Sequence, residues 1–371
     1  MNKKKINYVE IDKNFKKIKK NFLFQLNKIG NKGDFILGNK VKEFENKLKK
    51  IINSKYVATC ANGTDAIEIA LKILGIKKND EIITVANTWI SVANSIINVG
   101  AKPIFVDIND TLNLNPFEIE KKITNKTKCI IVTHLNGLPC DLDQIKRITK
   151  KHKIKILEDC SQAIGSKYEN LHVGNIGEIS TYSLHPTKNL GVFGDGGFIS
   201  TNKKNYYKKF LIFRNNGLIN RDLAKFVGRN SRLDNLQAIV GILQLKNLNK
   251  HITLRQKNAY SYDRAFINLK KFIQTPLKLN NKKVIHTYHR YVIRCTNRDK
   301  LFKYLIKNNI DVKIHYPINI HQQTSFKKFS KTKLLKTDSL NKKILSLPIH
   351  ENLSKNDLNR IIALIRNFYI K

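Results

Sequence analysis

Short apolar runs alternate with amphipathic segments between about residues 57 and 202. Five runs are rich in β-branched residues and short enough to be buried strands of a parallel sheet; they span residues 56–60, 81–85, 103–107, 129–133 and 155–159. Helix-like segments follow four of them, at residues 66–74, 89–99, 116–123 and 142–152. This alternation predicts an α/β layer built from right-handed crossovers.

The pattern changes twice further along the chain. Two strands, at residues 179–184 and 197–201, are joined by a glycine-rich turn instead of a full helix. Beyond residue 250 we predict a strand, a helix, a strand and a closing helix, at residues 284–294, 300–307, 312–316 and 355–369. We therefore expect an N-terminal arm and large domain over residues 1–250. A small α+β domain over residues 251–371 would flank a cleft.

Composition and charge narrow the class of protein. The 371 residues are 41% hydrophobic, with 69 Lys plus Arg, 28 Asp plus Glu and a net charge of +41. Only 12 of the basic residues are arginine, and the lysines are spread along the whole chain, which is typical of a solvated surface. We therefore do not expect nucleic-acid binding as the primary function. No apolar stretch is long enough for a membrane span, and the start of the chain does not resemble a secretory signal.

The five cysteines are odd in number and widely spaced, with no CxxC pair. This argues against a disulfide framework and favours a cytoplasmic protein. Histidine spacing gives no metal motif, and we expect no metal; His286 and His289 lie in a strand-like run and are interpreted as structural. The sequence also has no dinucleotide fingerprint after the first strand and no P-loop, which disfavours both classes of nucleotide-binding protein.

An acidic pair, Glu158-Asp159, ends a predicted buried strand. Side chains at the carboxyl end of such a strand point into the crevice where open α/β sheets bind ligands. Asp159 could hold a positively charged ring nitrogen, and Gln162 could reach the same ligand. The alternative is that Asp159 caps a following helix.

Lys188 lies in a turn punctuated by proline and glycine, directly after a predicted strand. A lysine held in such a pocket can lose its proton and form a Schiff base with an aldehyde. The alternative is one more exposed lysine. Gly63 and Thr64, between the first strand and its helix, could cradle a phosphate or form an ordinary turn and cap. Trp89, the one tryptophan, could stack on a flat cofactor or belong to the core.

Taken in order, these motifs resemble the DegT/DnrJ/EryC/StrS aminotransferases. The resemblance rests on Gly63-Thr64-Asp65-Ala66, Asn87-Thr88-Trp89, Glu158-Asp159 with Gln162, Ser183 with His185-Pro186-Thr187-Lys188-Asn189, and Gly194-Asp195-Gly196-Gly197. It continues through Phe35-Ile36-Leu37-Gly38, Asn230-Ser231-Arg232-Leu233-Asp234 with Gln237-Ala238, His315-Tyr316-Pro317 with His321 and Gln323, and Ser346-Leu347-Pro348. It implies the type I, aspartate-aminotransferase-like fold and pyridoxal 5'-phosphate as cofactor.

The resemblance also implies roles for individual residues. Lys188 would bind the cofactor aldehyde and shuttle the proton, while Asp159 would pair with the pyridine nitrogen. The remaining cofactor contacts would come from Gln162 at the ring hydroxyl, Trp89 on the ring face, and Gly63, Thr64 and Ser183 at the phosphate. Asn230 would reach that phosphate from the neighbouring subunit, which implies a homodimer with shared active sites.

The implied reaction moves an amino group from glutamate to a keto-sugar. The acceptor would be linked to a nucleotide, such as a dTDP- or UDP-keto-deoxyhexose, and serve surface polysaccharide or lipopolysaccharide synthesis. Residues 183–190 and 214–222 resemble a branch of the family that aminates the oxidised 8-position of Kdo. This second resemblance implies 8-oxo-Kdo as an alternative acceptor, giving 8-amino-3,8-dideoxy-manno-octulosonate. Four residues are candidates for the sugar pocket, each with a structural role as the alternative: His185, Arg229, His315 and His321.

Two other classes of function remain open. A basic, non-catalytic regulator that binds nucleic acid could use the same fold. A sugar dehydratase of this family would need another residue at Lys188.

Overall fold

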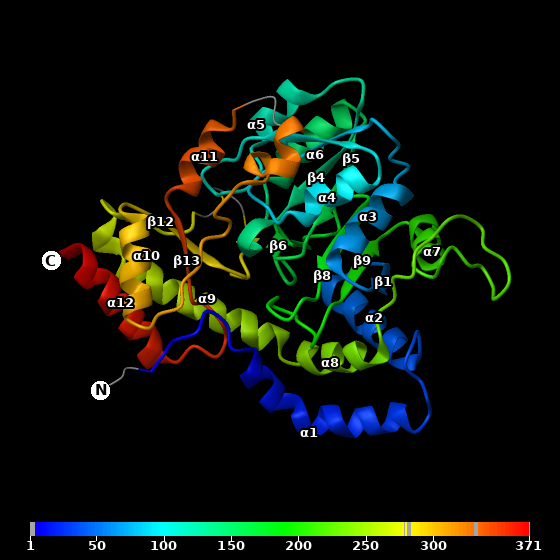
Figure 1. Ribbon diagram of the computed structural model, residues 1–371, viewed down its shortest axis with the longest axis horizontal. Coiled ribbons are helices and arrows are strands. Elements are labelled where there is room, and N and C mark those ends of the chain that lie inside the picture. The colour runs from blue at the N-terminus through cyan, green and yellow to red at the C-terminus, as the bar shows by residue number, and fades with distance from the viewer. Residues whose placement is uncertain (1–3, 278, 280–282, 330–332, 371) are drawn as a thin grey trace.

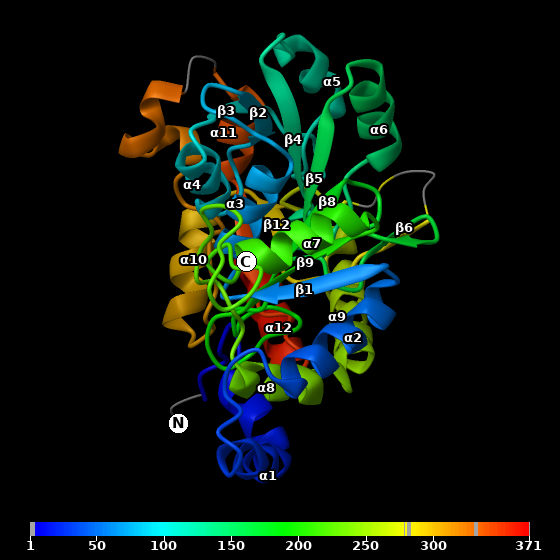
Figure 2. The same cartoon turned by 90° about the vertical axis from the view of Figure 1, so that its right-hand side faces the viewer.

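A seven-stranded sheet forms the centre of the molecule (Figures 1 and 2). The computed structural model describes residues 4–277, 279, 283–329 and 333–370. The strands of this sheet are β1 (Tyr56–Cys60), β2 (Glu81–Val85), β3 (Lys102–Val106), β4 (Thr127–Thr133), β5 (Lys155–Asp159), β8 (Ile179–Ser183) and β9 (Gly197–Thr201). Their order across the sheet is β1-β9-β8-β5-β4-β2-β3.

The sheet is mainly parallel, as predicted. The pairs β3–β2, β2–β4, β4–β5 and β5–β8 are all parallel. Strand β9 runs antiparallel to both β8 and β1. The prediction that residues 56–60 pair as a parallel strand was therefore wrong, because β1 joins the sheet edge only through the reversed strand β9. Since β1, β5 and β8 still point the same way, their carboxyl ends meet at one edge.

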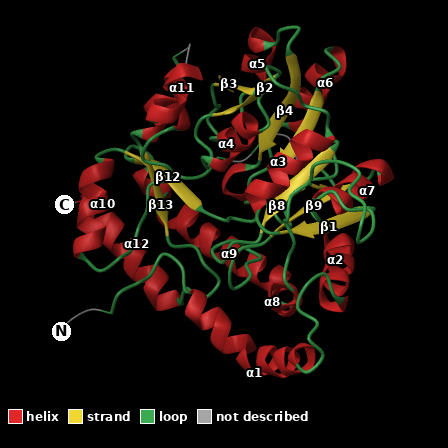
Figure 3. Cartoon of the chain, turned by 45° about the vertical axis from the view of Figure 1, so that its right-hand side comes forward, coloured by secondary structure: helices red, strands yellow, loops and turns green. Residues whose placement is uncertain are grey.

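Helices cover both faces of this sheet and surround the second domain (Figure 3). They are α1 (Ile11–Gly30), α2 (Asn39–Ile52), α3 (Gly63–Ile73), α4 (Ser91–Asn98), α5 (Pro116–Ile119), α6 (Leu142–Lys151), α7 (Lys204–Phe213), α8 (Asn235–Leu245), α9 (Leu248–Ala265), α10 (Arg298–Lys307), α11 (Leu335–Asn341) and α12 (Lys355–Ile370). Short 3-10 turns occur at Glu120–Lys122, Leu135–Gly137, Ile267–Leu269, Ile320–Gln322 and Thr324–Phe329. Helix α8 is apolar on nearly all sides, and it packs against α1 and α2.

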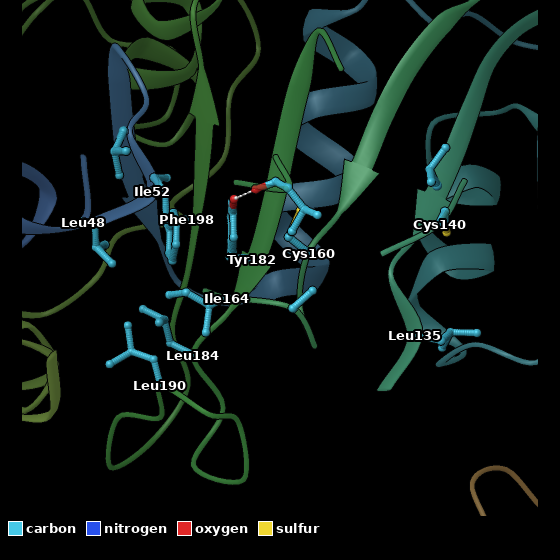
Figure 4. Packing of buried hydrophobic residues seen from close by; sticks show 14 of the residues in the cluster. Leu48, Ile52, Leu135, Cys140, Cys160, Ile164, Tyr182, Leu184, Leu190 and Phe198 are labelled. Carbon is cyan, nitrogen blue, oxygen red and sulfur yellow. Dashed lines mark hydrogen bonds between the residues drawn. The ribbon is translucent and has the colours of Figure 1, made fainter. Parts of the chain in front are cut away.

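The core under the site is built from aromatic and aliphatic side chains (Figure 4). Tyr182 of β8 stacks on Phe198 of β9, with ring centroids 4.2 Å apart and planes at 7°. Leu48 and Ile52 of α2 are buried on the same side of the sheet. Burying each such side chain stabilises the fold by roughly 1.5–3 kcal/mol. This packing holds β8, and the turn that follows it, in a fixed position.

A second sheet, of three strands, has its own hydrophobic core, and we call this part of the chain the small domain. Its strands are β10 (Ile273–Gln274), β12 (Tyr291–Cys295) and β13 (Ile344–Leu347), in the order β10-β12-β13. Ile6 is part of this core and pairs in parallel with Ile310. The N-terminal arm thus begins on the small domain before α1 runs beneath α8 (Figure 1).

Two predictions for the small domain were wrong. Residues 284–294 are not one strand: β11 (Val284–Ile285) pairs with β6 (Lys167–Tyr168), which also pairs with β7 (Leu171–His172), while β12 belongs to another sheet. Residues 312–316 form only an isolated bridge between Lys313 and Ser346. Both segments leave the strand conformation where their residues reach the cavity: Arg290 in the first segment, and His315 and Tyr316 in the second.

Candidate active site

A cavity of about 340 Å³ lies at the carboxyl ends of β5 and β8. The loops after β1 and β2 close one side, and Arg290, His315 and Tyr316 of the small domain close the other. This is the crevice in which an open α/β sheet is expected to bind a ligand.

Asp159, the last residue of β5, projects into this cavity and is 4% exposed. Its Oδ1 accepts a hydrogen bond of 3.1 Å from the backbone N–H of Ser161, and Thr133 Oγ1 donates one of 3.4 Å to Oδ2. No helix follows β5 in the described residues 160–178, so the alternative of a helix cap was wrong. The carboxylate is instead held in place and directed at whatever occupies the cavity.

Glu158 points to the opposite side of the strand, as successive residues must. The predicted acidic pair therefore does not enter the crevice together. Glu158 is fully buried and accepts hydrogen bonds from His134 Nε2 at 3.1 Å and from the N–H groups of Gly174, Ile176 and Gly177. Burial raises its pKa, but the hydrogen bonds from His134 and from the Gly177 and Gly174 N–H groups outweigh that effect and lower the pKa overall. Glu158 anchors the loop between β7 and β8.

His134, Glu158 and Cys160 offer ligand atoms within 4.8 Å of one another. His134 Nδ1 accepts from the backbone N–H of Cys140 at 3.1 Å, so Nε2 carries the proton that is donated to Glu158. Burial raises the pKa of the Cys160 thiol well above its usual value. The ring nitrogens of His134 and the carboxylate of Glu158 are therefore already engaged in hydrogen bonds within the protein.

Lys188 is held in the cavity by a tight turn after β8. Its backbone N–H donates to the His185 carbonyl at 2.8 Å, and the turn closes at Gly191, where a Cβ atom would lie 2.6 Å from the Pro186 oxygen. Burial and the charge of Arg290 lower the pKa of Lys188 to about 8, while the Asp159 carboxylate opposes this shift. Lys188 is therefore a poised amine and not one more exposed lysine.

The N-terminus of α3 provides a place for a phosphate. Asn62 caps this helix by accepting a 2.8 Å hydrogen bond from the Asp65 N–H, which leaves Gly63 and Thr64 as its first residues at the cavity wall. A Cβ atom on Gly63 would lie 2.9 Å from Cβ of Ser183. The glycine lets the helix end approach β8, so that backbone N–H groups and the Ser183 hydroxyl converge on one spot.

Gln162 and Trp89 line the same cavity. Gln162 Oε1 accepts a hydrogen bond of 2.8 Å from the Asn136 N–H, so its NH₂ group is left to donate into the cavity. The Trp89 side chain is 56% exposed, with its ring centroid 5.4 Å from that of Tyr316. Trp89 is thus not a core residue and presents a free aromatic face.

The other predicted residues fall into two groups. His185 and His315 line the cavity, and burial is the main cause that lowers the pKa of both imidazoles, that of His315 to about 2. Arg229, Asn230 and His321 do not line it. Arg229 pairs with Asp65 at 2.8 Å, exposed Asn230 bridges to Asn215, and buried His321 pairs with Asp338 at 3.1 Å.

The structure also brings residues into the cavity that the sequence analysis did not single out. Arg290 is the most prominent, and Tyr316, which appeared only as part of a motif, receives its 3.0 Å hydrogen bond. The sequence around Arg290 did not predict a site residue, because residues 284–294 resemble one continuous strand. Only the break between β11 and β12 turns it toward Lys188.

Comparison with known proteins gives the same picture. The profile of the DegT/DnrJ/EryC1/StrS aminotransferase family matches residues 16–366. The chain belongs to this family. It is 34% identical over 365 residues to the "Pleiotropic regulatory protein" of Geobacillus stearothermophilus, covering 97% of this chain and 98% of that one.

Named enzymes are among its relatives. The chain is 34% identical to a UDP-2-acetamido-2-deoxy-3-oxo-D-glucuronate aminotransferase of Pseudomonas aeruginosa, covering 98% of this chain and all of the relative. The crystal structure of Streptomyces venezuelae DesV with a ketimine intermediate matches with a TM-score of 0.94 and 27% identity, covering 98% of both chains. Other relatives are named for dTDP- and GDP-linked sugars.

Family membership confirms the type I fold, the sugar aminotransferase activity and pyridoxal phosphate as cofactor. The cavity fits this cofactor: it has a lysine amine, a buried carboxylate, an amide donor and a helix N-terminus for the phosphate. Among the described helices, none has both the length and the apolar composition to cross a membrane.

Proposed function

We propose that this enzyme transfers the amino group of glutamate to a keto-sugar carried by a nucleoside diphosphate, such as a dTDP- or UDP-keto-deoxyhexose. The product would supply surface polysaccharide or lipopolysaccharide synthesis in the cytoplasm. Relatives named for dTDP-, UDP- and GDP-linked sugars support this acceptor class.

The observation that carries the proposal is that Lys188, Asp159 and Gln162 converge on the cavity that also contains the phosphate cradle. Pyridoxal phosphate, when bound, supplies an electron sink for the substrate carbon. Lys188 holds the cofactor through its amine and, once released by substrate, moves the proton at that carbon. A pKa of about 8 suits this role, because the amine can accept and return a proton near neutral pH.

The neighbouring side chains orient and tune the cofactor. The buried Asp159 carboxylate keeps the ring nitrogen protonated. The Gln162 NH₂ group donates to the ring oxygen, and Trp89 covers one ring face. Gly63, Thr64 and Ser183 bind the phosphate, while His185 and His315, neutral at working pH, face the sugar.

We further propose a homodimer in which Asn230 completes the partner's phosphate site. Asn230 does not line the cavity of its own chain; it ends residues 214–230, the segment that follows α7. This segment projects beyond α7 at the right of Figure 1. This segment exposes the apolar side chains of Ile219, Leu223 and Val227, the last 91% exposed. A second copy would bury this surface.

A mixed dimer tests this arrangement. K188A and N230A, each expected to be weak alone, are co-expressed with different tags and the hybrid is purified. Shared sites predict that one intact site returns, with about half of the wild-type activity per dimer. A hybrid no more active than its parents would contradict the sharing of Asn230.

Two alternatives to this function are also distinguished by the assay described below. A carboxylated acceptor such as 8-oxo-Kdo is favoured by the buried, carboxylate-free Arg290 in the cavity. A regulator is suggested by the name of one relative, but a regulator has no need of the converging Lys188, Asp159 and Gln162.

The test of the proposal is a two-step assay. Glutamate is added to cofactor-loaded enzyme, and we expect the visible band to disappear with formation of one 2-oxoglutarate per site. The gel-filtered enzyme is then offered dTDP- and UDP-keto-sugars and 8-oxo-Kdo. If the first step fails, glutamate is not the amino donor. If none of these sugars is aminated, the proposed class of acceptor is wrong. DNA binding by cofactor-free protein that falls steeply with salt would favour the regulator.

A further inference from the structure

Four arginines are buried among the described residues, and three of them pair with a carboxylate. Arg214 contacts Glu45 at 2.6 Å, Arg255 contacts Glu351 at 2.8 Å and Arg294 contacts Asp110 at 2.8 Å. Arg290 is 9% exposed, and no described Asp or Glu lies within ion-pair distance of it. A buried guanidinium without an anion is costly, so this charge needs a partner from outside the chain.

The guanidinium is fixed and still has donors free. Its Nη2 donates to Tyr316 Oη at 3.0 Å, and its carbon lies 5.0 Å from the centroid of the same ring. Neither Nε nor Nη1 has a protein partner, yet neither is among the buried polar atoms that lack one, so both face open space. An arginine held in this way presents the planar fork that suits a carboxylate.

Arg290 stands where two cavities meet. One is the cofactor cavity with Lys188; the other, of about 350 Å³, lies against the N-terminal arm and the small domain. Thr187 and His315 also line both. A molecule that reacts at Lys188 could therefore place a second group on Arg290.

The second cavity has no unpaired acid to compete for this position. Its one lining carboxylate, Asp311, contacts Lys313 at 2.6 Å. The imidazole of His289 makes no hydrogen bond, and its Nδ1 is buried without a partner. Burial, followed by the charges of Lys188 and Arg290, lowers the pKa of His289 well below its usual value, so this ring is neutral. The second cavity therefore carries the uncompensated positive charge of Arg290, and the His289 ring is free to form hydrogen bonds there.

We propose that Arg290 binds the carboxylate of a substrate while that substrate reacts at Lys188. This inference rests on the proposed function, in which two substrates can carry a carboxylate: the amino donor glutamate, and an acidic sugar acceptor such as a uronate or an ulosonate. Arg290 would decide which amines and ketones react by requiring a carboxylate at a fixed distance from the reacting carbon.

The test compares R290Q and R290K with R294Q. Arg294 is equally buried, but it is paired with Asp110 and does not line the cofactor cavity. It is therefore the matched control. All variants must first show wild-type cofactor absorbance, which establishes that they fold and load. Binding is then measured with glutarate, an unreactive dicarboxylate, by titration calorimetry.

Single-turnover rates are measured with L-glutamate, with UDP-2-acetamido-3-amino-2,3-dideoxyglucuronate and with neutral dTDP-3-amino-3,6-dideoxygalactose. We expect R290Q to lose at least about tenfold in the single-turnover rate with a carboxylated amine but not with the neutral one, with partial recovery in R290K and no change in R294Q. Loss with glutamate, together with weaker glutarate binding, assigns the carboxylate to the donor. Loss with the acidic sugar alone assigns it to the acceptor.

Wild-type rates for both carboxylated amines in R290Q, or an equal loss with all three amines, would overturn the role of Arg290. If the wild-type enzyme aminates no sugar, the acceptor class fails instead. Glutarate binding and the glutamate half-reaction then still report on Arg290.

Discussion

The backbone N–H of Asn136 donates a 2.8 Å hydrogen bond to Oε1 of Gln162. This contact joins the turn after β4 to the turn after β5 and fixes which end of the amide faces the cavity. Gln162 can therefore only donate to a bound cofactor, never accept from it.

This orientation predicts the effect of two substitutions at Gln162. Q162E keeps the acceptor for Asn136 but places a carboxylate oxygen against the ring oxygen of the cofactor, so its Kd for pyridoxal phosphate should rise more than tenfold. Q162A removes the hydrogen bonds to the cofactor and from Asn136 but adds no repulsive oxygen, so it should raise the Kd for pyridoxal phosphate less than Q162E does. Spectrophotometric titration of apoprotein measures both. Equal Kd values for the two variants would contradict the assigned orientation.

The lowered pKa of Lys188 predicts a pH dependence for cofactor capture. Only the neutral amine attacks an aldehyde, so the capture rate of apoprotein should rise with pH and level off above about 8. R290Q removes a positive charge that disfavours the ammonium, so the pKa and the midpoint should move to higher pH. Stopped-flow absorbance between pH 6 and about 10.5 measures the midpoint. A wild-type midpoint near the ordinary lysine value, or a downward shift in R290Q, would show that the charge assignment is wrong.

Gly63 sets the distance between the N-terminus of α3 and β8. G63A would place a Cβ atom 2.9 Å from Cβ of Ser183, forcing the phosphate cradle apart. We expect the Kd for pyridoxal phosphate to rise about tenfold or more, which corresponds to overpacking by roughly 1–3 kcal/mol. G30A is the matched control, because no atom lies within 4 Å of its added carbon. Similar affinities for the two variants would refute a close cradle.

The Glu45–Arg214 pair links α2 to the loop after α7 beneath β1. Glu45 also accepts from the Thr59 backbone N–H and hydroxyl, both at 2.8 Å. E45Q leaves a buried guanidinium uncompensated and should lower the free energy of unfolding by about 3–5 kcal/mol. E118Q, in the more exposed pair with Lys121, should change it by less than about 1 kcal/mol. Urea unfolding at one protein concentration compares them, and equal effects would contradict the role of burial.

The sequence predicted the large domain better than the small one, for a physical reason. Runs such as residues 155–159 are buried on both faces of a parallel sheet, so continuous β-branched residues mark the strand directly. Residues 284–294 carry a similar run, but their strand assignment depends on two different partners, β6 and β13, that lie far away in the sequence.

The candidate site shows the same division. Asp159 ends a strand, and Gln162 and Lys188 lie in turns that follow strands, so position in the sheet already predicts that they face the crevice. Arg290 reaches the cavity only because the small domain folds back over the large one. That Arg290 has no carboxylate partner becomes visible only when its neighbours in the structure are compared with those of the other three buried arginines.

The most direct test of the central claim is to locate the cofactor on the chain. Cofactor-loaded enzyme is reduced with borohydride and digested, and the peptide that carries the phosphopyridoxyl group is identified by mass spectrometry. We expect one modified lysine per chain, Lys188, and none after K188A. Modification of another lysine, or wild-type absorbance and transamination in K188A, would contradict this assignment.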